Sequence, residues 1–346
     1  MKPKLSIILF WLVHSYVIAQ ISDFKHINFT KANNIAKLHE GATLDNLPLL
    51  SYKLTHKLST DVEKFRAIYS WVCQNIKGDN VQHNRVAIAQ QKHKDNPKGY
   101  LQWNETYKAT AFSKLLKSKK TMCTGYAYLI RELCLLANIE CKIINGYSRS
   151  VDANIAALDI VNHSWNAVKL NNKWYLCDAT WSSGYIDAYN SFITEYNDGY
   201  FLTEPTFFAK THFPTDKDWL FTDKVTMQNF TEAPLIYGEA YKHNIQPTNS
   251  QTMHMTINKG DTITFSFVSP HHSFNKAISM VRFVGQKEKT YRIDNFRNNN
   301  GQISFTYQFK HKGKFDTHIK VNDDIIATYT IKVKKKKTDK NETASL

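Results

Sequence analysis

Three residues between positions 123 and 178 have the types and spacing that thiolate chemistry needs. Cys123 stands where the apolar run TMCTGYAYLIRELCLLANIE begins, directly after the basic stretch 117–120. His163 lies in NHSWNAV and Asp178 in WYLCDATW. A thiol is a useful nucleophile only as the thiolate, a histidine can take its proton, and an aspartate can orient the imidazole and stabilise its cation. The sequence therefore predicts a site in which Cys123 attacks a carbonyl carbon.

The helix predicted from Cys123 would stabilise the thiolate. Amides and the macrodipole at a helix N-terminus favour negative charge, and Lys119 and Lys120 add a weaker contribution. Cys134 lies about 20° from Cys123 around this helix, so we expect it in the core beneath the nucleophile. An oxyanion hole would use the Cys123 amide and a second donor, for which Gln102 and Trp103 are candidates.

The two short segments that carry His163 and Asp178 read as a hairpin. Residues 161–170 and 173–180 alternate as strands do, and Asn171-Asn172 tolerates the positive φ of a two-residue turn. This register places His163 opposite Thr180, so Asp178 projects on the same face at a diagonal separation of about 7–8 Å. We therefore predict an imidazole–carboxylate hydrogen bond.

Other elements of the first two-thirds follow from local signals. Thr60 and Glu63 have the spacing of a capping box, followed by apolar residues at helical spacing up to Gly78. A short helix is expected after Pro48, another near residues 112–116, and a strand at 140–147. The polar segment 79–105, which contains DNPKG, reads as a loop bordering the site.

From about residue 253 the pattern changes to short, partly alternating strands with turn signals between them. They are predicted at 253–257, 262–268, 278–284, 303–309, 315–321 and 325–333. Their regular spacing favours an antiparallel β-sandwich of immunoglobulin type, and because this region has no cysteine, the sandwich must be held by packing.

The region from about Asp61 to Leu220 resembles the transglutaminase-like superfamily of papain-fold cysteine enzymes, and within it the kyphoscoliosis-peptidase-like branch. The resemblance is carried by DVEKFRAIYSWVCQNI, MCTGYAYLIRELCLLANIECKIINGY, NHSWNAVKLNNKWYLCDATWSSG and GYFLTEPTFFAKTHFP. It implies that Cys123 is the nucleophile, His163 the base and Asp178 the orienting acid. It also implies an α+β fold, a nucleophile-bearing helix on an antiparallel sheet.

The expected domain organisation combines these features. We predict a signal peptide at 1–19, a catalytic domain with a helical lead-in at 20–222, a connector at 223–240, an immunoglobulin-like β-sandwich at 241–335 and a disordered basic tail at 336–346. Lys2 and Lys4, the apolar stretch 5–13 and a cut before Gln20 are typical of export, so a periplasmic, cell-surface or secreted location is expected. No later segment is expected to cross a membrane.

The five cysteines do not read as a disulfide scaffold in a chain of this size. Buried free thiols are the ordinary interpretation for Cys73, Cys134, Cys141 and Cys177, with a Cys134–Cys141 bond as an open alternative. A metal site built from Cys123, His163 and Asp178 is a further alternative, but no short-spaced Cys/His pair supports it, so we expect neither metal nor cofactor.

The net charge of +15 bears on partners. Between Val81 and Lys120 the basic residues exceed the acidic ones by seven, and such a surface can hold an anionic polymer. No nucleic-acid motif is present, so nucleic acid is not an expected partner. The expected partner is a protein or peptide substrate, with a cell-envelope component as one candidate.

Two functions of different class follow. The first is an exported cysteine enzyme, a hydrolase or acyl transferase that forms a thioester with protein or peptide amides. The second is a catalytically silent envelope adaptor or binding protein that keeps the fold. The complete Cys–His–Asp set favours the first.

Overall fold

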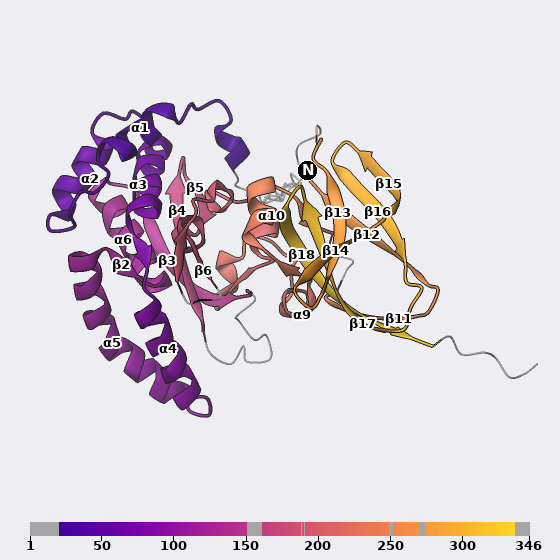
Figure 1. Cartoon of the computed structure of the whole chain (residues 1–346). Coiled ribbons are helices and arrows are strands. Elements are labelled where there is room, and N and C mark those ends of the chain that lie inside the picture. Colours follow the sequence, from indigo (N-terminus) through magenta and orange to yellow (C-terminus); the bar gives the residue numbers. More distant parts are fainter. Residues whose placement is uncertain are drawn as a thin grey trace, which may run out of the picture.

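The chain folds around a four-stranded antiparallel sheet that lies between a helical layer and a β-rich region (Figure 1). The computed structural model describes residues 21–150, 161–187, 189, 191–248, 252–269 and 274–335. The expected signal peptide and the expected basic tail lie outside the described residues.

The helical layer is built from the first third of the chain. It comprises η1 (Ile21–Phe24), α1 (Thr30–Leu38), α2 (Leu47–Thr55), α3 (Asp61–Asn75), α4 (Asn80–Lys92), α5 (Pro97–Ser118) and α6 (Cys123–Leu136). The predicted capping box starts α3: the Glu63 N–H donates to the Thr60 hydroxyl at 3.3 Å, and the Thr60 N–H donates to the Glu63 carboxylate at 3.0 Å. Two otherwise unpaired backbone donors are thereby satisfied.

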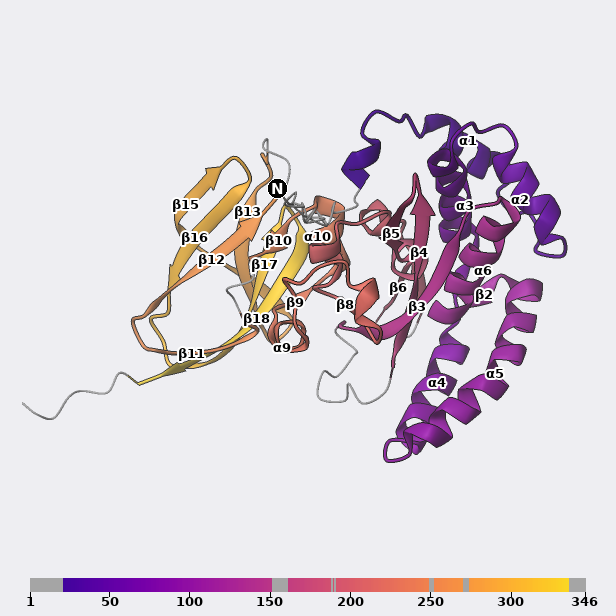
Figure 2. The ribbon, with the colours of Figure 1, turned by 180° about the vertical axis from the view of Figure 1, so that it is seen from behind.

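The prediction of a loop at 79–105 is wrong, because this segment forms most of a helical hairpin, α4 and α5. The Asp79 carboxylate accepts the Gln82 N–H at 3.1 Å and caps α4. Asn96 caps α5 in the same way, and Pro97 occupies its first position. DNPKG therefore starts a helix instead of interrupting one, since proline fits the first helical turn. The hairpin projects away from the sheet in both views (Figure 2).

The base of this hairpin is closed by a short parallel pair, β1 (Lys77–Gly78) with β2 (Lys120–Thr121). β2 leads directly into α6, so this pairing fixes where α6 begins. Gly125 is needed in the first turn of α6, because a Cβ there would lie 1.9 Å from the Thr121 hydroxyl oxygen. The close approach of α6 to β2 thus depends on the absence of a side chain.

The central sheet has the order β5-β4-β3-β8. Its strands are β3 (Cys141–Ser148), β4 (His163–Leu170), β5 (Lys173–Cys177) and β8 (His212–Pro214). The predicted asparagine turn is confirmed: Asn171 and Asn172 have φ of 49° and 62°, and Leu170 pairs with Lys173.

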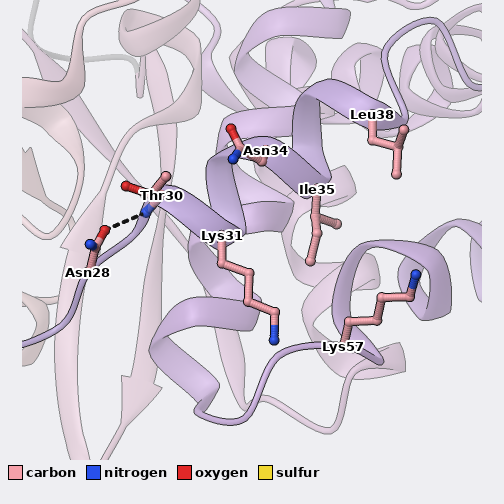
Figure 3. Close-up of a pocket in the computed structure, with 7 residues that line it drawn as sticks. All are labelled: Asn28, Thr30, Lys31, Asn34, Ile35, Leu38 and Lys57. Carbon is pink, nitrogen blue, oxygen red and sulfur yellow. Dashed lines mark hydrogen bonds between the residues drawn. The ribbon is translucent and has the colours of Figure 1, made fainter.

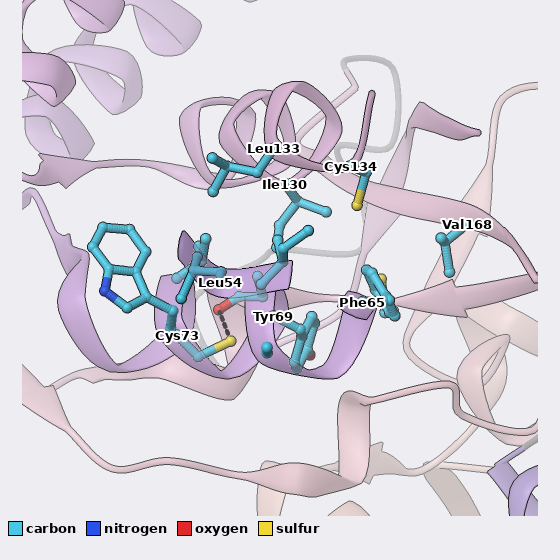
Figure 4. Packing of buried hydrophobic residues seen from close by; sticks show 14 of the residues in the cluster. Leu54, Phe65, Tyr69, Cys73, Ile130, Leu133, Cys134 and Val168 are labelled. Carbon is cyan, nitrogen blue, oxygen red and sulfur yellow. Dashed lines mark hydrogen bonds between the residues drawn. The ribbon is translucent and has the colours of Figure 1, made fainter. Parts of the chain in front are cut away.

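The two faces of the sheet belong to two hydrophobic clusters. Val168 and Leu170 pack into the helical layer with residues of α2, α3 and α6 (Figure 4), whereas Trp165 and Ala167 pack toward the β-rich region. The alternation of side chains along β4 therefore joins both halves of the molecule to one strand.

A connecting region of short elements follows β5. It contains α7 (Ala179–Ser183), β6 (Gly184–Ile186), β7 (Phe192–Thr194), η3 (Asp198–Tyr200), α8 (Pro205–Phe208), η4 (Lys217–Trp219), α9 (Met227–Glu232), β9 (Leu235–Ile236), α10 (Gly238–His243) and β10 (Gln246–Pro247). Two of these strands extend the β-rich region, because β9 pairs with its last strand and β10 pairs with β12 (Thr262–Val268).

The β-rich region consists of two packed sheets, β10-β12-β16-β15 and β11-β18-β17-β13-β14, the second with β9 attached. Its remaining strands are β11 (His254–Asn258), β13 (Ile278–Val284), β14 (Lys287–Tyr291), β15 (Asp294–Asn299), β16 (Gln302–Gln308), β17 (Gly313–Val321) and β18 (Asp324–Lys334). Phe265 and Tyr329 meet edge to face between the sheets, 5.1 Å apart. All six predicted strands are found, but β14 and β15 were not predicted because they are largely polar and exposed and show no alternation.

Within the described residues, none of the helices combines the length and the hydropathy that crossing a membrane would require.

The Thr60 cap of α3 gives a test of the fold. We expect Thr60→Ala to destabilise the protein by about 1 kcal/mol, because it removes the acceptor for the Glu63 N–H. Urea denaturation followed by circular dichroism measures the change. Thr106→Ala, at an exposed position inside α5, is the control and should change stability by less than about 0.5 kcal/mol. Equal effects of the two substitutions would contradict a stabilising role for the cap.

Candidate active site

Cys123 is the first residue of α6, and its position leaves the start of that helix open. Met122 precedes it and contributes no side-chain cap. The backbone N–H groups of Cys123 and Thr124, which precede the first bond of the helix from Gly125 to the Met122 carbonyl, are therefore the ones available near the sulfur. The helix is held by buried Tyr126, Leu129, Ile130 and Leu133, while Cys123 itself stays partly exposed.

His163 begins β4 and lies between the sulfur and a carboxylate. Its Nε2–H donates to Asp178 Oδ2 at 2.8 Å, and the ring acts on the Cys123 thiol, whose pKa it lowers. Trp181 packs against the ring with centroids 5.2 Å apart. The prediction that His163 and Asp178 meet through a hydrogen bond is therefore confirmed.

The predicted secondary structure around Asp178 is wrong in one respect. We expected a strand through Thr180 with His163 opposite it, but β5 ends at Cys177, and Thr180 lies in α7. Asp178 is the N-cap of α7, and its Oδ1 accepts the N–H groups of Thr180 at 2.8 Å and Trp181 at 3.3 Å. Capping turns the chain out of the strand, because a carboxylate satisfies the free amides of a helix start.

Asp178 is fully buried and fully hydrogen-bonded. In addition to the two amides on Oδ1, its Oδ2 accepts from both His163 and His212, the latter at 3.1 Å. Its backbone is also fixed, since the Tyr69 hydroxyl donates to the Asp178 carbonyl at 2.9 Å. Such a carboxylate can orient an imidazole without freedom to rotate.

The electrostatics favour a thiolate–imidazolium pair. Burial acts to raise the pKa of the Cys123 thiol, but the hydrogen bond and charge of His163 and the Ser164 backbone N–H outweigh it, so the pKa lies below its ordinary value. Burial acts to lower the pKa of His163, yet the charge and hydrogen bond of Asp178, with a contribution from Cys123, raise it to about 10. Burial likewise opposes ionisation of Asp178, but the two histidines hold the pKa of its carboxyl well below the usual range. These shifts favour a proton on the imidazole over a proton on the sulfur.

His212 was not singled out from the sequence. It stands in the segment GYFLTEPTFFAKTHFP, which has no clear periodicity, and its partner Asp178 is 34 residues away. No local pattern could have found this contact.

The donor atoms of His163, Asp178 and His212 lie within 4.8 Å of one another, a spacing that a metal ion could bridge. Both histidine Nε2 atoms, however, already bond the same carboxylate oxygen. Two protons would have to leave before a metal could use these atoms. We therefore interpret the three residues as a hydrogen-bonded group.

The two residues considered as oxyanion donors lie on α5. Gln102 is exposed, and Trp103 stacks between Tyr100 and Tyr107. The charge of Cys123 also acts on another α5 side chain, that of buried Tyr100. Burial raises the pKa of the Tyr100 hydroxyl, a hydrogen bond from Gln90 opposes this rise, and the charge of Cys123 adds to it. The identity of the second donor stays a prediction.

The remaining cysteines are free and buried. Cys134 lies in the core against Cys141, as its helical phase predicts, and burial raises the pKa of the thiols at 73, 134 and 177. Cys123 is thus the accessible, acidic thiol of the five.

A surface groove lies apart from this site, on the outer side of α1. Asn28, Thr30, Lys31, Asn34, Ile35, Leu38 and Lys57 line it (Figure 3). None of these residues belongs to α6 or to the central sheet, so the groove is separate from Cys123.

The ion pair makes a testable prediction for iodoacetamide alkylation of Cys123. At about pH 6 the wild-type sulfur should react, since its pKa is lowered, whereas His163→Ala should slow the reaction roughly ten-fold or more because burial then dominates. When the alkylation rate is measured as a function of pH, its midpoint should lie at a higher pH in His163→Ala than in the wild type.

His243→Ala is the matched control, because His243 also bonds a carboxylate, that of Asp324 at 2.8 Å, but in α10. An alkylation midpoint that is the same in wild type and His163→Ala would show that His163 does not ionise the thiol.

Comparison with known proteins places this arrangement in a family. The model of the transglutaminase-like superfamily matches residues 49–179. Human kyphoscoliosis peptidase is 29% identical over 287 residues, which cover 81% of this chain and 39% of that protein. The mouse protein of the same name is 32% identical over 222 residues (63% and 31%), and Hillarin of Drosophila melanogaster is 25% identical over 208 residues (56% and 23%). The chain thus spans well under half the length of these relatives.

The matched segment contains α6, β3, β4 and β5, and with them Cys123, His163 and Asp178. The predicted α+β class, a helix-bearing core on an antiparallel sheet followed by a β-rich region, agrees with this match. Residues 49–179 thus match the transglutaminase-like superfamily, and the chain is similar to the kyphoscoliosis peptidases.

Proposed function

We propose that this protein is an exported cysteine enzyme that transfers or hydrolyses acyl groups of protein or peptide amides through a thioester on Cys123. One observation carries the proposal: His163, which lowers the pKa of the Cys123 thiol at the start of α6, is hydrogen-bonded to a fully satisfied Asp178. The three residues then act as nucleophile, acid–base group and orienting carboxylate.

In the first half-reaction the Cys123 thiolate attacks the carbonyl carbon of an amide and forms a carbon–sulfur bond. The negative charge moves to the carbonyl oxygen, for which the N–H groups at the open start of α6 are available. His163 then gives its proton to the amide nitrogen, the carbon–nitrogen bond breaks, and the amine leaves. A thioester and a neutral His163 remain.

In the second half-reaction neutral His163 takes a proton from water or from a primary amine as that molecule attacks the thioester carbonyl. Collapse of the tetrahedral intermediate breaks the carbon–sulfur bond and restores the thiolate beside the imidazolium. Water yields a carboxylic acid, and an amine yields a new amide. Asp178 stays ionised throughout and stabilises the imidazolium.

The names of the human and mouse relatives support amide hydrolysis as one outcome, because both proteins are called peptidases. The family name supports transfer to an amine as the other. The alternative class, a catalytically silent envelope adaptor, keeps the fold but needs no ionised thiol. The lowered pKa of Cys123 therefore favours the enzyme.

A peptide library with glutamine residues, offered with a fluorescent primary amine, tests the proposal and separates its two outcomes. We expect either amine incorporation or release of cleaved or deamidated peptide, and we expect Cys123→Ala to lower the rate by about 10³-fold or more. Mass spectrometry of the peptides measures both products.

Cys141→Ala is the control, since Cys141 is a buried free thiol outside the site. It should retain the rate of the wild type. Product formation that survives Cys123→Ala would remove Cys123 as the nucleophile, and a lack of any product would favour the adaptor.

A further inference from the structure

His212 is an unusual neighbour for the Cys–His–Asp arrangement, because it is a second histidine on the same carboxylate oxygen. Its side chain is completely buried in β8, and its Nε2 lies 3.1 Å from Asp178 Oδ2. Stacking on Phe208, with centroids 4.0 Å apart, and packing against Trp181 at 4.5 Å fix the plane of its ring. The ring can therefore neither tilt nor leave the carboxylate easily.

The hydrogen-bond chemistry of Asp178 determines where the protons of both histidines must be. An ionised carboxylate only accepts, so each histidine needs a proton on Nε2 to bond it. For His163 this leaves Nδ1 to face Cys123. His212 is neutral near physiological pH, because burial and the charge of His163, only partly offset by Asp178 and the Phe208 backbone, lower its pKa to about 4. Its Nδ1 must then be an acceptor.

Thr211 supplies the donor that this tautomer needs. The Thr211 hydroxyl oxygen lies 2.9 Å from His212 Nδ1, and it also contacts the Tyr241 hydroxyl. Thr211 can donate its proton to His212 Nδ1, while the Tyr241 hydroxyl donates to the Phe207 carbonyl at 3.0 Å. A series of donors then runs from Thr211 through His212 to Asp178.

The reverse orientation fails at the carboxylate. In that orientation Thr211 would donate to Tyr241, and His212 would have to donate from Nδ1. A neutral His212 would then present a bare Nε2 to the Asp178 carboxylate, so that two acceptors would meet in a buried site. The first orientation is therefore the stable one.

We propose that His212 is a positioning residue, held as the neutral Nε2–H tautomer by Thr211 and Asp178, that shares Asp178 Oδ2 with His163 and limits how strongly Asp178 binds the proton of His163. This inference rests on the proposed function of Cys123 and His163. The second N–H on the shared oxygen draws charge from it and places a positive dipole end near the imidazolium. His163 consequently stays acidic enough to return its proton to a leaving nitrogen.

Most of the other ionisable groups around these residues are tyrosines and cysteines that stay neutral near pH 7. Burial raises the pKa of each tyrosine and cysteine that faces the site from α3, α5, α6, η3, α10 and β5, namely Tyr69, Cys73, Tyr100, Tyr126, Cys177, Tyr200 and Tyr241. The carboxylates of Glu204 and Glu239 act on Tyr241 and Tyr200. Burial lowers the pKa of Lys210, two residues before His212, to about 8, so the charge of this residue also changes near neutral pH.

Nitrogen-15 NMR of the full chain with labelled histidine tests the tautomer directly, and it does not depend on enzymatic activity. We expect wild-type His212 to show a protonated Nε2 and an unprotonated Nδ1 between about pH 6 and pH 8. Thr211→Val, which keeps the shape but removes the donor, should weaken this preference. A wild-type His212 protonated at Nδ1, or at both nitrogens, would overturn the proposal.

Alkylation of Cys123 by iodoacetamide tests the effect on His163. His212→Phe keeps a stacked ring but removes the N–H, so the imidazolium should become more stable and the alkylation midpoint should fall by about half a pH unit or more. His212→Gln, whose amide can donate from a similar position, should restore the wild-type midpoint. His318→Phe is the control, since His318 also bonds a threonine through Nδ1, but on β17.

The outcomes distinguish the proposed role of His212 from the proposed function of Cys123 and His163. An unchanged midpoint in His212→Phe, or a rise in both His212 variants alike, would show that His212 has only a structural role, while the proposed function stands. An ordinary thiol midpoint in the wild-type protein would instead remove the proposed function itself. Should His212→Phe not fold, Thr211→Val gives the same alkylation test, and an unchanged midpoint there would overturn the proposal.

Discussion

The arrangement of the site depends on one buried carboxylate. Asp178 has no exposed surface, and its two oxygens accept from the Thr180 and Trp181 amides and from two histidines. A buried charge that loses its partner costs about 3–5 kcal/mol, so these contacts must form together. They join the end of β5, the start of α7, the start of β4 and β8 at one point. The contact that places His163 is thus the same contact that fixes the local fold.

The surrounding layers explain why this point is rigid. α6 and the helical layer cover one face of the central sheet, and the connecting region and the β-rich region cover the other. The second cluster is continuous from Trp165 and Phe208 to the interior of the two β-sheets. His212 stacks on Phe208, and Tyr241 lies on α10, which packs beside β18. The β-rich region therefore helps to hold the Asp178 carboxylate in place, through the residues that contact His212.

Local signals predicted much of this structure, and contacts between distant segments account for what they missed. The capping box at Thr60, the turn at Asn171-Asn172 and the strands of the β-rich region each depend on neighbours in sequence, and all are found. The helix α4 was missed because its faces are polar and its cap at Asp79 was not recognised as a helix start. The site was predicted as far as Cys123, His163 and Asp178. Thr211, His212 and Tyr241 could not be predicted, since their bonds to Asp178 and to one another arise only when β8 and α10 fold against the sheet.

The central claim is that Cys123 is a thiolate paired with the His163 imidazolium. The ultraviolet absorbance of the thiolate, recorded against pH as the difference between wild type and Cys123→Ser, measures it most directly. We predict that the absorbance is already present at about pH 6, because His163 lowers the pKa of Cys123. Absorbance that emerges only at or above about pH 8.5, as for an ordinary thiol, would contradict the account.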